Sequence, residues 1–240
     1  MQARKVPANK ILISGLPVSN KFDNFNNKKT IREKFGLPNN KKIALVIAGA
    51  NESGPYKNFR KTLNDCIKLF AKMDWMHFVF CVGKDDEYAS KLIKKANRCS
   101  AQNFTVKTFT EDLAALMFAS DIALIKPGGL VITECASAGL PILLVGKTYA
   151  QENINRRYLV FEDAAEHATT YKGVINLLCD IFSDEKRYLA LKNNLAQIAE
   201  KPASKLIAEA VSKILNNEEN YYQSYPKFSL YLGNQPAHTR

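Results

Sequence analysis

The sequence lacks the features that mark membrane-spanning, secreted and metal-binding proteins. No apolar run approaches the roughly 20 residues that a helix needs to cross a bilayer, and residues 1–10 lack the apolar core of a signal peptide. The three histidines are scattered, so their spacing indicates neither a zinc site nor a nucleophile–base pair. We therefore expect a cytoplasmic protein without bound metal or metal catalysis.

Cysteine is present, but not in the arrangement of a disulfide framework or a metal site. The five cysteines are odd in number and form no metal-type pairs. Four of them fall within apolar patterns, where we expect reduced thiols that pack in the core: Cys66, Cys81, Cys135 and Cys179. Cys99 lies in a polar stretch.

Acidic residues are scarce relative to basic ones. The chain has 34 Lys and Arg against 23 Asp and Glu, a formal net charge of +11. Nucleic acid, an anionic membrane surface and a polyanionic small ligand would each suit this charge. Nucleic acid is not expected, because the lysines are spread over residues 28–42, 57–72 and 91–107 rather than grouped with aromatic residues in a stacking motif. Two explanations stay open. One is binding to an anionic membrane surface, to which each basic group contributes about 1 kcal/mol of binding energy. The other is an ordinary solvated surface.

Regular alternation of apolar strands and amphipathic helices predicts an α/β fold. We expect strands at residues 43–48, 77–82, 104–107, 122–125 and 142–145, and helices at 30–35, 56–72, 87–96, 113–118, 130–138, from 151, 171–182, 184–200 and 204–215. This order predicts a Rossmann-like parallel sheet flanked by helices on both faces, with ligands beyond the carboxyl ends of the strands. We expect an N-terminal segment and linker at 1–40, one domain at 41–215 and a tail at 216–240.

The segment 120–155 contains the clearest candidate for a binding site. An apolar strand stops at Lys126 and Pro127, and a helix follows the turn at Gly128 and Gly129. The free N–H groups at a helix start favour an anion such as a diphosphate, and glycine lets a ligand approach the backbone closely. Glu134, about one turn into the helix, could accept both hydroxyls of a ribose. The alternative is an ordinary strand–helix turn followed by a solvated glutamate.

Two further loops follow predicted strands. Residues 49–55 form a turn-rich loop that is a second candidate phosphate loop or an ordinary strand–helix turn. Gln151 and Glu152 open a polar helix, either because they bind sugar hydroxyls or because an acid is favoured in a first helical turn.

The segment KPGGLVITECASAGLPILL, followed by Gln151-Glu152-Asn153 and Asn155, resembles the donor-binding half of GT-B glycosyltransferases. It is most similar to processive diacylglycerol glucosyltransferases and plant monogalactosyldiacylglycerol synthases. The N-acetylglucosaminyltransferase that completes the lipid-linked peptidoglycan precursor is a more distant likeness. The resemblance covers roughly residues 10–170, with supporting matches at 15–18, 43–54 and 109–112.

The resemblance implies half of a GT-B fold that binds a UDP-sugar, with no cofactor. In such a half, the base lies beside Phe109 with Thr110 reading its edge, and the hexose lies against Gln151 and Glu152. The donor-binding residues implied in this way are Gly49, Asn51, Phe109, Thr110, Lys126, Pro127, Gly128, Gly129, Leu130, Glu134, Gln151, Glu152 and Asn155. Besides the alternatives given above, Phe109 could be a core residue and Lys126 an ordinary surface lysine.

The resemblance also implies that a catalytic group is missing. Only about fourteen residues precede Gly15, where related enzymes have the acceptor-binding domain and the catalytic base. We therefore expect the donor half of an inverting enzyme that moves a hexose to a membrane lipid such as diacylglycerol, inactive alone and peripheral on the cytoplasmic face. Its catalytic residues cannot be assigned. Two alternatives are a UDP-sugar-binding subunit that works with a separate acceptor-domain partner, and a non-catalytic nucleotide-sugar sensor.

Overall fold

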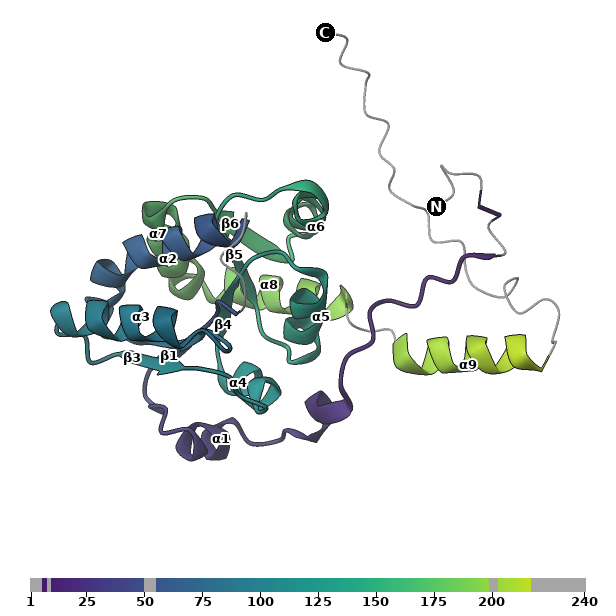
Figure 1. Ribbon diagram of the computed structural model, residues 1–240, viewed down its shortest axis with the longest axis horizontal. Helices are drawn as coiled ribbons and strands as arrows, with labels where there is room; N and C mark the ends of the chain where they lie inside the picture. The colour runs from purple at the N-terminus through teal and green to yellow at the C-terminus, as the bar shows by residue number, and fades with distance from the viewer. Residues whose placement is uncertain (1–5, 8–9, 50–54, 199–202, 217–240) are drawn as a thin grey trace, which may run out of the picture.

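The computed structural model describes residues 6–7, 10–49, 55–198 and 203–216, and its centre is one parallel sheet (Figure 1). The strands lie in the order β3-β2-β1-β4-β5-β6. Their bounds are β1 Lys42–Ile47, β2 Met76–Cys81, β3 Phe104–Lys107, β4 Ile122–Ile125, β5 Ile142–Val145 and β6 Ala165–Ala168. The direction of strand addition reverses between β1 and β4, which is the position where open α/β sheets bind ligands. The predicted Rossmann-like sheet is confirmed.

The sheet carries helices on both faces. The helices of the described residues are η3 Asn20–Asn24, α1 Lys28–Lys34, α2 Pro55–Phe70, α3 Asp86–Arg98, α4 Leu113–Ala119, α5 Gly129–Ser137, α6 Ala150–Phe161, α7 Tyr171–Ser183, α8 Glu185–Ile198 and α9 Ala203–Leu215. A core that includes Phe59, Tyr88 and Val174 joins α2, α3 and α7 to one face. On the other face, Leu116 and Cys135 bring α4 and α5 against the strands. Figure 1 shows α9 to one side of this layered body.

The central strands are buried on both faces, which explains their sequence. Every residue of β2, β4 and β5 is buried. Parallel strands covered by helices on both sides have no solvent-facing row, so they read as continuous apolar runs rather than as alternating patterns. This is why the expected bounds 122–125 and 142–145 agree with β4 and β5. The expected bounds 104–107 also agree with β3, which is a half-buried edge strand.

Strand β6 was not predicted, because its sequence lacks such a run. Residues 165–168 read AEHA, and two of the four side chains are only half-buried. The strand exists because it pairs in register with β5 at the edge of the sheet, with Ile142 opposite Ala165. Tertiary pairing overrides the weak strand propensity of alanine and glutamate.

A buried ion network attaches α1 to the sheet. Asp121 Oδ2 accepts hydrogen bonds from Ile43 N and from the Arg32 guanidinium, both at 2.6 Å, and Asp121 Oδ1 accepts one from Lys28 Nζ at 2.7 Å. Burial alone would raise the pKa of Asp121, but the two cations and the Ile43 amide lower it. Residues 28–34 therefore pack on the body of the domain, although the expected boundary places them in the N-terminal segment.

The cysteine prediction was wrong at one position. Cys66, Cys81 and Cys135 are buried, and burial raises the pKa of the Cys66 and Cys81 thiols to about 12. Cys179 is exposed, because it lies on the outer surface of α7 while Val174, Leu178 and Ile181 face the core. Among the described helices, none is both long and apolar enough to span a bilayer.

Candidate functional site

The turn between β4 and α5 lies at the carboxyl edge of the sheet, beside the reversal of strand order. Gly128 is the N-cap of α5 in extended conformation, and no side chain caps this helix end. The first intrahelical bond comes from Ile132 N to Gly128 O at 3.1 Å. The N–H groups of the preceding residues 129–131 therefore have no partner within the helix, and the helix begins where the sequence predicted.

Gly129 is the glycine that the packing of this turn favours. A Cβ on Gly129 would lie 3.2 Å from Leu16 Cδ1 and 3.9 Å from Asn155 Nδ2, whereas at Gly128 its nearest neighbour would be Val131 at an ordinary 3.6 Å. Asn155 Nδ2 also donates to Pro127 O at 3.0 Å. The structure thus brings Asn155 of α6 and Leu16 of the N-terminal segment against the turn.

Lys126 and Glu152 form an ion pair across this edge. Lys126 Nζ donates to Glu152 Oε1, and both side chains are largely shielded from solvent. Lys126 is therefore not an ordinary surface lysine. Within the described part of the chain, Glu152 Oε2 is buried and has no hydrogen-bond partner. A buried acceptor without a hydrogen-bond donor destabilises the fold, so this oxygen is a candidate to accept a hydrogen bond from a hydroxyl group of a ligand.

Glu134 lies on α5, one turn below Leu130 on the same helix face. Its side chain is half-buried, and burial raises its pKa. No hydrogen bond or ion pair among residues 6–7, 10–49, 55–198 and 203–216 engages the carboxylate. A half-buried carboxylate with open acceptor positions is the group that a ribose diol requires.

Phe109 and Thr110 share the carboxyl edge of the sheet but lie beyond β3, on the far side of β1 and β2. Phe109 is 59% exposed, so it is not a core residue, and Lys84 Nζ lies 5.4 Å from its ring centroid. Thr110 Oγ1 accepts from Asp112 N at 3.1 Å. No hydrogen bond or ion pair in the described chain joins these two residues to the cluster around Lys126.

The other predicted residues differ in what surrounds them. A Cβ added at Gly49 would meet no atom within 4 Å, so packing there does not require glycine. Gln151 is exposed in the first turn of α6. Asn51 lies outside the described residues, as do residues 217–240 of the expected tail.

The sequence did not predict how the loop after β5 is held. Gly146 has φ +87°, and its carbonyl oxygen lies 2.8 Å from His167 Nε2 on β6. Asn58 Oδ1 on α2 accepts from Lys147 N at 2.7 Å. Burial lowers the pKa of His167, so its ring is neutral at pH 7. The glycine after an apolar strand was the available signal, whereas Asn58 and His167 reach the loop only through the fold.

A second set of contacts fixes the start of α6. Asn153 Oδ1 accepts from Thr148 Oγ1 at 3.1 Å and from Arg156 Nη2 at 2.9 Å. The segment that presents Gln151 and Glu152 is therefore tied to its neighbours on both sides. This arrangement gives the site a fixed wall rather than a loosely held loop.

Comparison with known proteins identifies the family. The profile of the lipid-A-disaccharide synthetase family matches residues 10–179. Processive diacylglycerol beta-glucosyltransferases are similar in sequence: that of Bacillus licheniformis is 27% identical over 216 residues, covering 89% of this chain and 54% of the relative. That of Bacillus cytotoxicus is 28% identical over 220 residues, covering 91% and 53%. The chain spans about half the length of the curated relatives it matches.

Solved structures with low sequence identity share the fold. The lipopolysaccharide glycosyltransferase WaaG aligns with a TM-score of 0.61 at 15% identity, covering 83% of this chain and 54% of WaaG. The UDP-GlcNAc 2-epimerase of Neisseria meningitidis, bound to UDP-GlcNAc, aligns with a TM-score of 0.65 at 20% identity, covering 88% and 58%. Anabaena HepE in complex with UDP-glucose gives 0.59 at 15% identity, covering 79% and 52%. The chain thus belongs to the lipid-A-disaccharide synthetase family and folds as one Rossmann-like half of a GT-B glycosyltransferase.

Proposed function

We propose that this chain is the donor-binding half of a glycosyltransferase that moves a hexose from a UDP-sugar to a membrane lipid such as diacylglycerol. The curated relatives named above carry diacylglycerol glucosyltransferase names, and two of the structural neighbours contain UDP-sugars. These names support the substrate classes. The observation that carries the proposal is the uncapped start of α5 beside two carboxylates, Glu134 and Glu152, that have acceptor oxygens to offer.

Each part of a UDP-sugar has a suitable partner in this arrangement. The diphosphate carries negative charge and would lie against the N–H groups of residues 129–131. The ribose hydroxyls would donate to Glu134, and a hexose hydroxyl would donate to Glu152 Oε2, with Gln151 at the outer edge. The exposed Phe109 ring offers a surface for the base. We infer that these groups bind the donor without a metal or cofactor.

The proposed reaction is a direct displacement at the anomeric carbon. The acceptor hydroxyl oxygen forms a bond to that carbon while the bond to the UDP oxygen breaks, and its electron pair leaves with UDP. The positive end of α5 stabilises the charge that develops on the departing diphosphate, and the neighbouring Lys126 adds a positive charge. The proton of the acceptor hydroxyl passes to a base outside the residues named here, so this chain alone is expected to bind donor without turnover.

Calorimetric titration tests the proposal directly. We expect saturable binding of UDP and of one or more of UDP-glucose, UDP-galactose and UDP-N-acetylglucosamine, with ADP-glucose as the control for base recognition. Absence of UDP binding by the folded chain, or equal affinity for ADP-glucose and UDP-glucose, would contradict a UDP-sugar site.

An exposed apolar face on α6 supports the proposal that an acceptor-binding half docks against this domain. Ile154, Tyr158 and Phe161 repeat at helical spacing, and their exposed fractions are 68%, 51% and 67%. Apolar side chains at this spacing on a solvent-facing helix mark an interaction surface. We infer that this face of α6 docks against the acceptor-binding half, whether that half belongs to the same polypeptide or to a separate subunit. Ile154→Ser/Phe161→Ser should abolish turnover in a reconstituted enzyme while leaving UDP affinity unchanged.

A further inference from the structure

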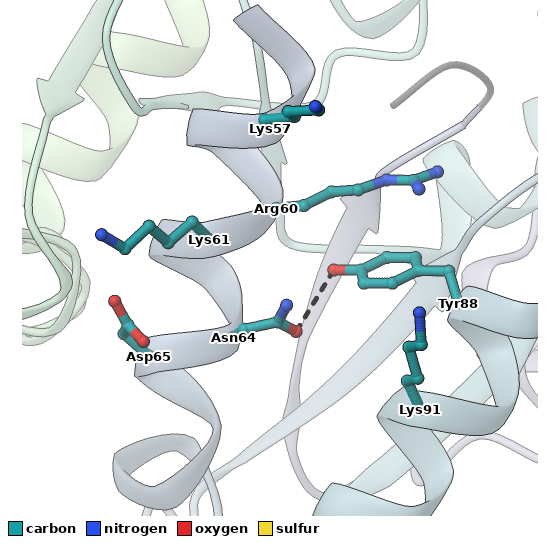
Figure 2. Close-up of a pocket in the computed structure, with 7 residues that line it drawn as sticks. All are labelled: Lys57, Arg60, Lys61, Asn64, Asp65, Tyr88 and Lys91. Atoms are coloured by element: carbon teal, nitrogen blue, oxygen red, sulfur yellow. Dashed lines mark hydrogen bonds between the residues drawn. The ribbon is translucent and has the colours of Figure 1, made fainter. Parts of the chain in front are cut away.

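A second candidate site lies between α2 and α3, away from the turn that begins α5. The two helices line an open cavity of about 390 Å³ (Figure 2). Its lining contains four basic side chains, from Lys57, Arg60, Lys61 and Lys91, and one acidic side chain, from Asp65. Asp85 and Glu87 pair with Arg60 and Lys91, so the excess of positive charge is smaller than the lining alone gives, but basic groups still outnumber acidic ones and favour an anionic occupant.

Arg60 is the buried basic residue of the cavity lining, and its neighbours hold its side chain in place. The Arg60 side chain is 6% exposed, and its guanidinium donates to Asp85 Oδ2 at 2.7 Å and to Ala48 O at 3.0 Å. The same guanidinium lies 4.2 Å from the centroid of the Tyr88 ring. Asp85 also accepts from Tyr88 N at 2.9 Å as the N-cap of α3. These contacts tie α3 to α2, so the cavity is formed before any ligand binds, which lowers the entropic cost of binding.

Neutral hydrogen-bond donors lie on the same wall. The Tyr88 hydroxyl donates to Asn64 Oδ1 at 3.4 Å, and burial raises the pKa of Tyr88, so the hydroxyl stays protonated. This contact fixes the Asn64 amide with its oxygen toward Tyr88. Figure 2 shows the Asn64 amide nitrogen pointing along α2 toward Arg60, into the space between the two helices. The Asn64 amide N–H and the buried Arg60 side chain therefore both line the space between α2 and α3.

Two flexible lysine side chains complete the cavity. Figure 2 shows Lys57 on α2 and Lys91 on α3 at opposite ends of the wall, while Lys61 and Asp65 extend to the other side of α2 in this view. Within the described residues, no carboxylate forms an ion pair with Lys57. Lys91 pairs with Glu87 at 2.6 Å, but both side chains are more than half exposed, and such a pair contributes little to stability. A doubly charged anion could draw both ammonium groups inward.

We propose that the α2–α3 cavity is a phosphate-binding site, separate from the donor site at α5. A phosphate group has the charge and the acceptor oxygens that this combination of ammonium groups, guanidinium and amide requires. The phosphate of an anionic lipid headgroup and a free phosphate ion share this chemistry. The inference goes beyond donor binding, because it uses none of the residues assigned to the UDP-sugar.

The site can be tested by NMR titration of the full chain with inorganic phosphate. We expect amide shifts at residues 57–64 and 88–91. The variant Lys57→Ala/Lys91→Ala should weaken phosphate binding about tenfold, as loss of charged hydrogen bonds does. The matched control is Lys68→Ala/Lys94→Ala, which removes one exposed cation from each of the same two helices but outside the cavity lining. The control should change phosphate affinity less than about twofold, since long-range surface charge is screened.

Sedimentation with vesicles distinguishes the two sources of phosphate. Binding to phosphatidylglycerol vesicles that is lost in Lys57→Ala/Lys91→Ala but kept in the control assigns the site to a lipid headgroup. Phosphate binding without vesicle binding assigns it to a soluble anion. Either result supports the site. Equal loss in both double variants, no shifts at residues 57–64 and 88–91, or shifts only at residues 126–131 would overturn it.

The UDP titration separates this inference from the proposed function. Lys57→Ala/Lys91→Ala should bind UDP as the unmodified chain does. A joint loss of phosphate and UDP affinity in a folded variant would show that the cavity is part of the donor site, which would overturn the inference. If the unmodified chain binds no UDP, the proposed function fails while the phosphate titration still tests the α2–α3 cavity.

Discussion

Replacing Gly146 with alanine should destabilise the protein more than the same change at another glycine with positive φ. Gly146 has φ +87°, and an added Cβ would lie 3.1 Å from Asn58 Oδ1, 3.2 Å from Phe59 Cα and 3.3 Å from Phe59 N. Two of these atoms belong to the backbone of α2. The third is fixed by its hydrogen bond from Lys147 N. The clash therefore cannot be relieved by turning one side chain.

The matched control is Gly139→Ala. Gly139 has φ +60°, but a Cβ there would meet only Lys192 Cε, at an ordinary 3.7 Å. Both variants incur the cost of a left-handed alanine, about 1 to 2 kcal/mol. Only Gly146→Ala adds overpacking, about 1 to 3 kcal/mol. Gly146→Ala should therefore lower the free energy of unfolding by about 1 to 3 kcal/mol more than Gly139→Ala does.

Urea unfolding followed by circular dichroism measures this difference, and the melting temperature gives a second reading at about 2 to 4 °C per kcal/mol. Gly146→Ala should also weaken UDP-sugar binding, because the loop it distorts leads into the segment with Gln151 and Glu152. Equal destabilisation by the two variants would refute the argument that α2 is packed against this loop.

The remaining predictions concern the donor site and the α1 network. Glu134→Ala should weaken UDP binding by about 1 to 3 kcal/mol, as loss of a charged hydrogen bond does, and unchanged affinity in a folded variant would remove Glu134 from the ribose site. Gln151→Ala and Glu152→Ala should lose the preference for a UDP-sugar over UDP in calorimetry; equal losses for both ligands would contradict a role in sugar binding. Asp121→Asn should cost about 3 to 5 kcal/mol of stability by leaving Arg32 without its buried partner. The folded-state pKa of Asp121 is lowered, so its contribution is present above the unfolded pKa of about 4 and is lost as the pH falls below it. Melting temperatures between pH 2 and 7 should therefore fall in acid less steeply for Asp121→Asn than for the unmodified chain; parallel curves would contradict this.

The order of the elements could be predicted because it depends on local patterns. Apolar runs bounded by turn residues mark β4 and β5, and the glycine turn at 128–129 marks the start of α5. Once strands and helices alternate, a parallel sheet with ligands at its carboxyl edge follows from chain connectivity. The candidate residues around that turn were found in the same way, since they follow a strand directly.

Tertiary structure decided the features that depend on distant pairs. Lys126 and Glu152 are predicted separately as donor-binding residues, yet they form an ion pair because β4 and the start of α6 meet at one edge. Strand β6 gains its hydrogen bonds only from β5.

The sequence by itself therefore determined the fold class, the family and the position of the glycine turn before α5, because each depends on residues that are neighbours in the chain. Only the tertiary structure decided that Asp121 attaches α1 to the sheet and that α2 and α3 line a basic cavity. The physical reason is that ion pairs and cavities arise between side chains whose separation in sequence says nothing about their separation in space.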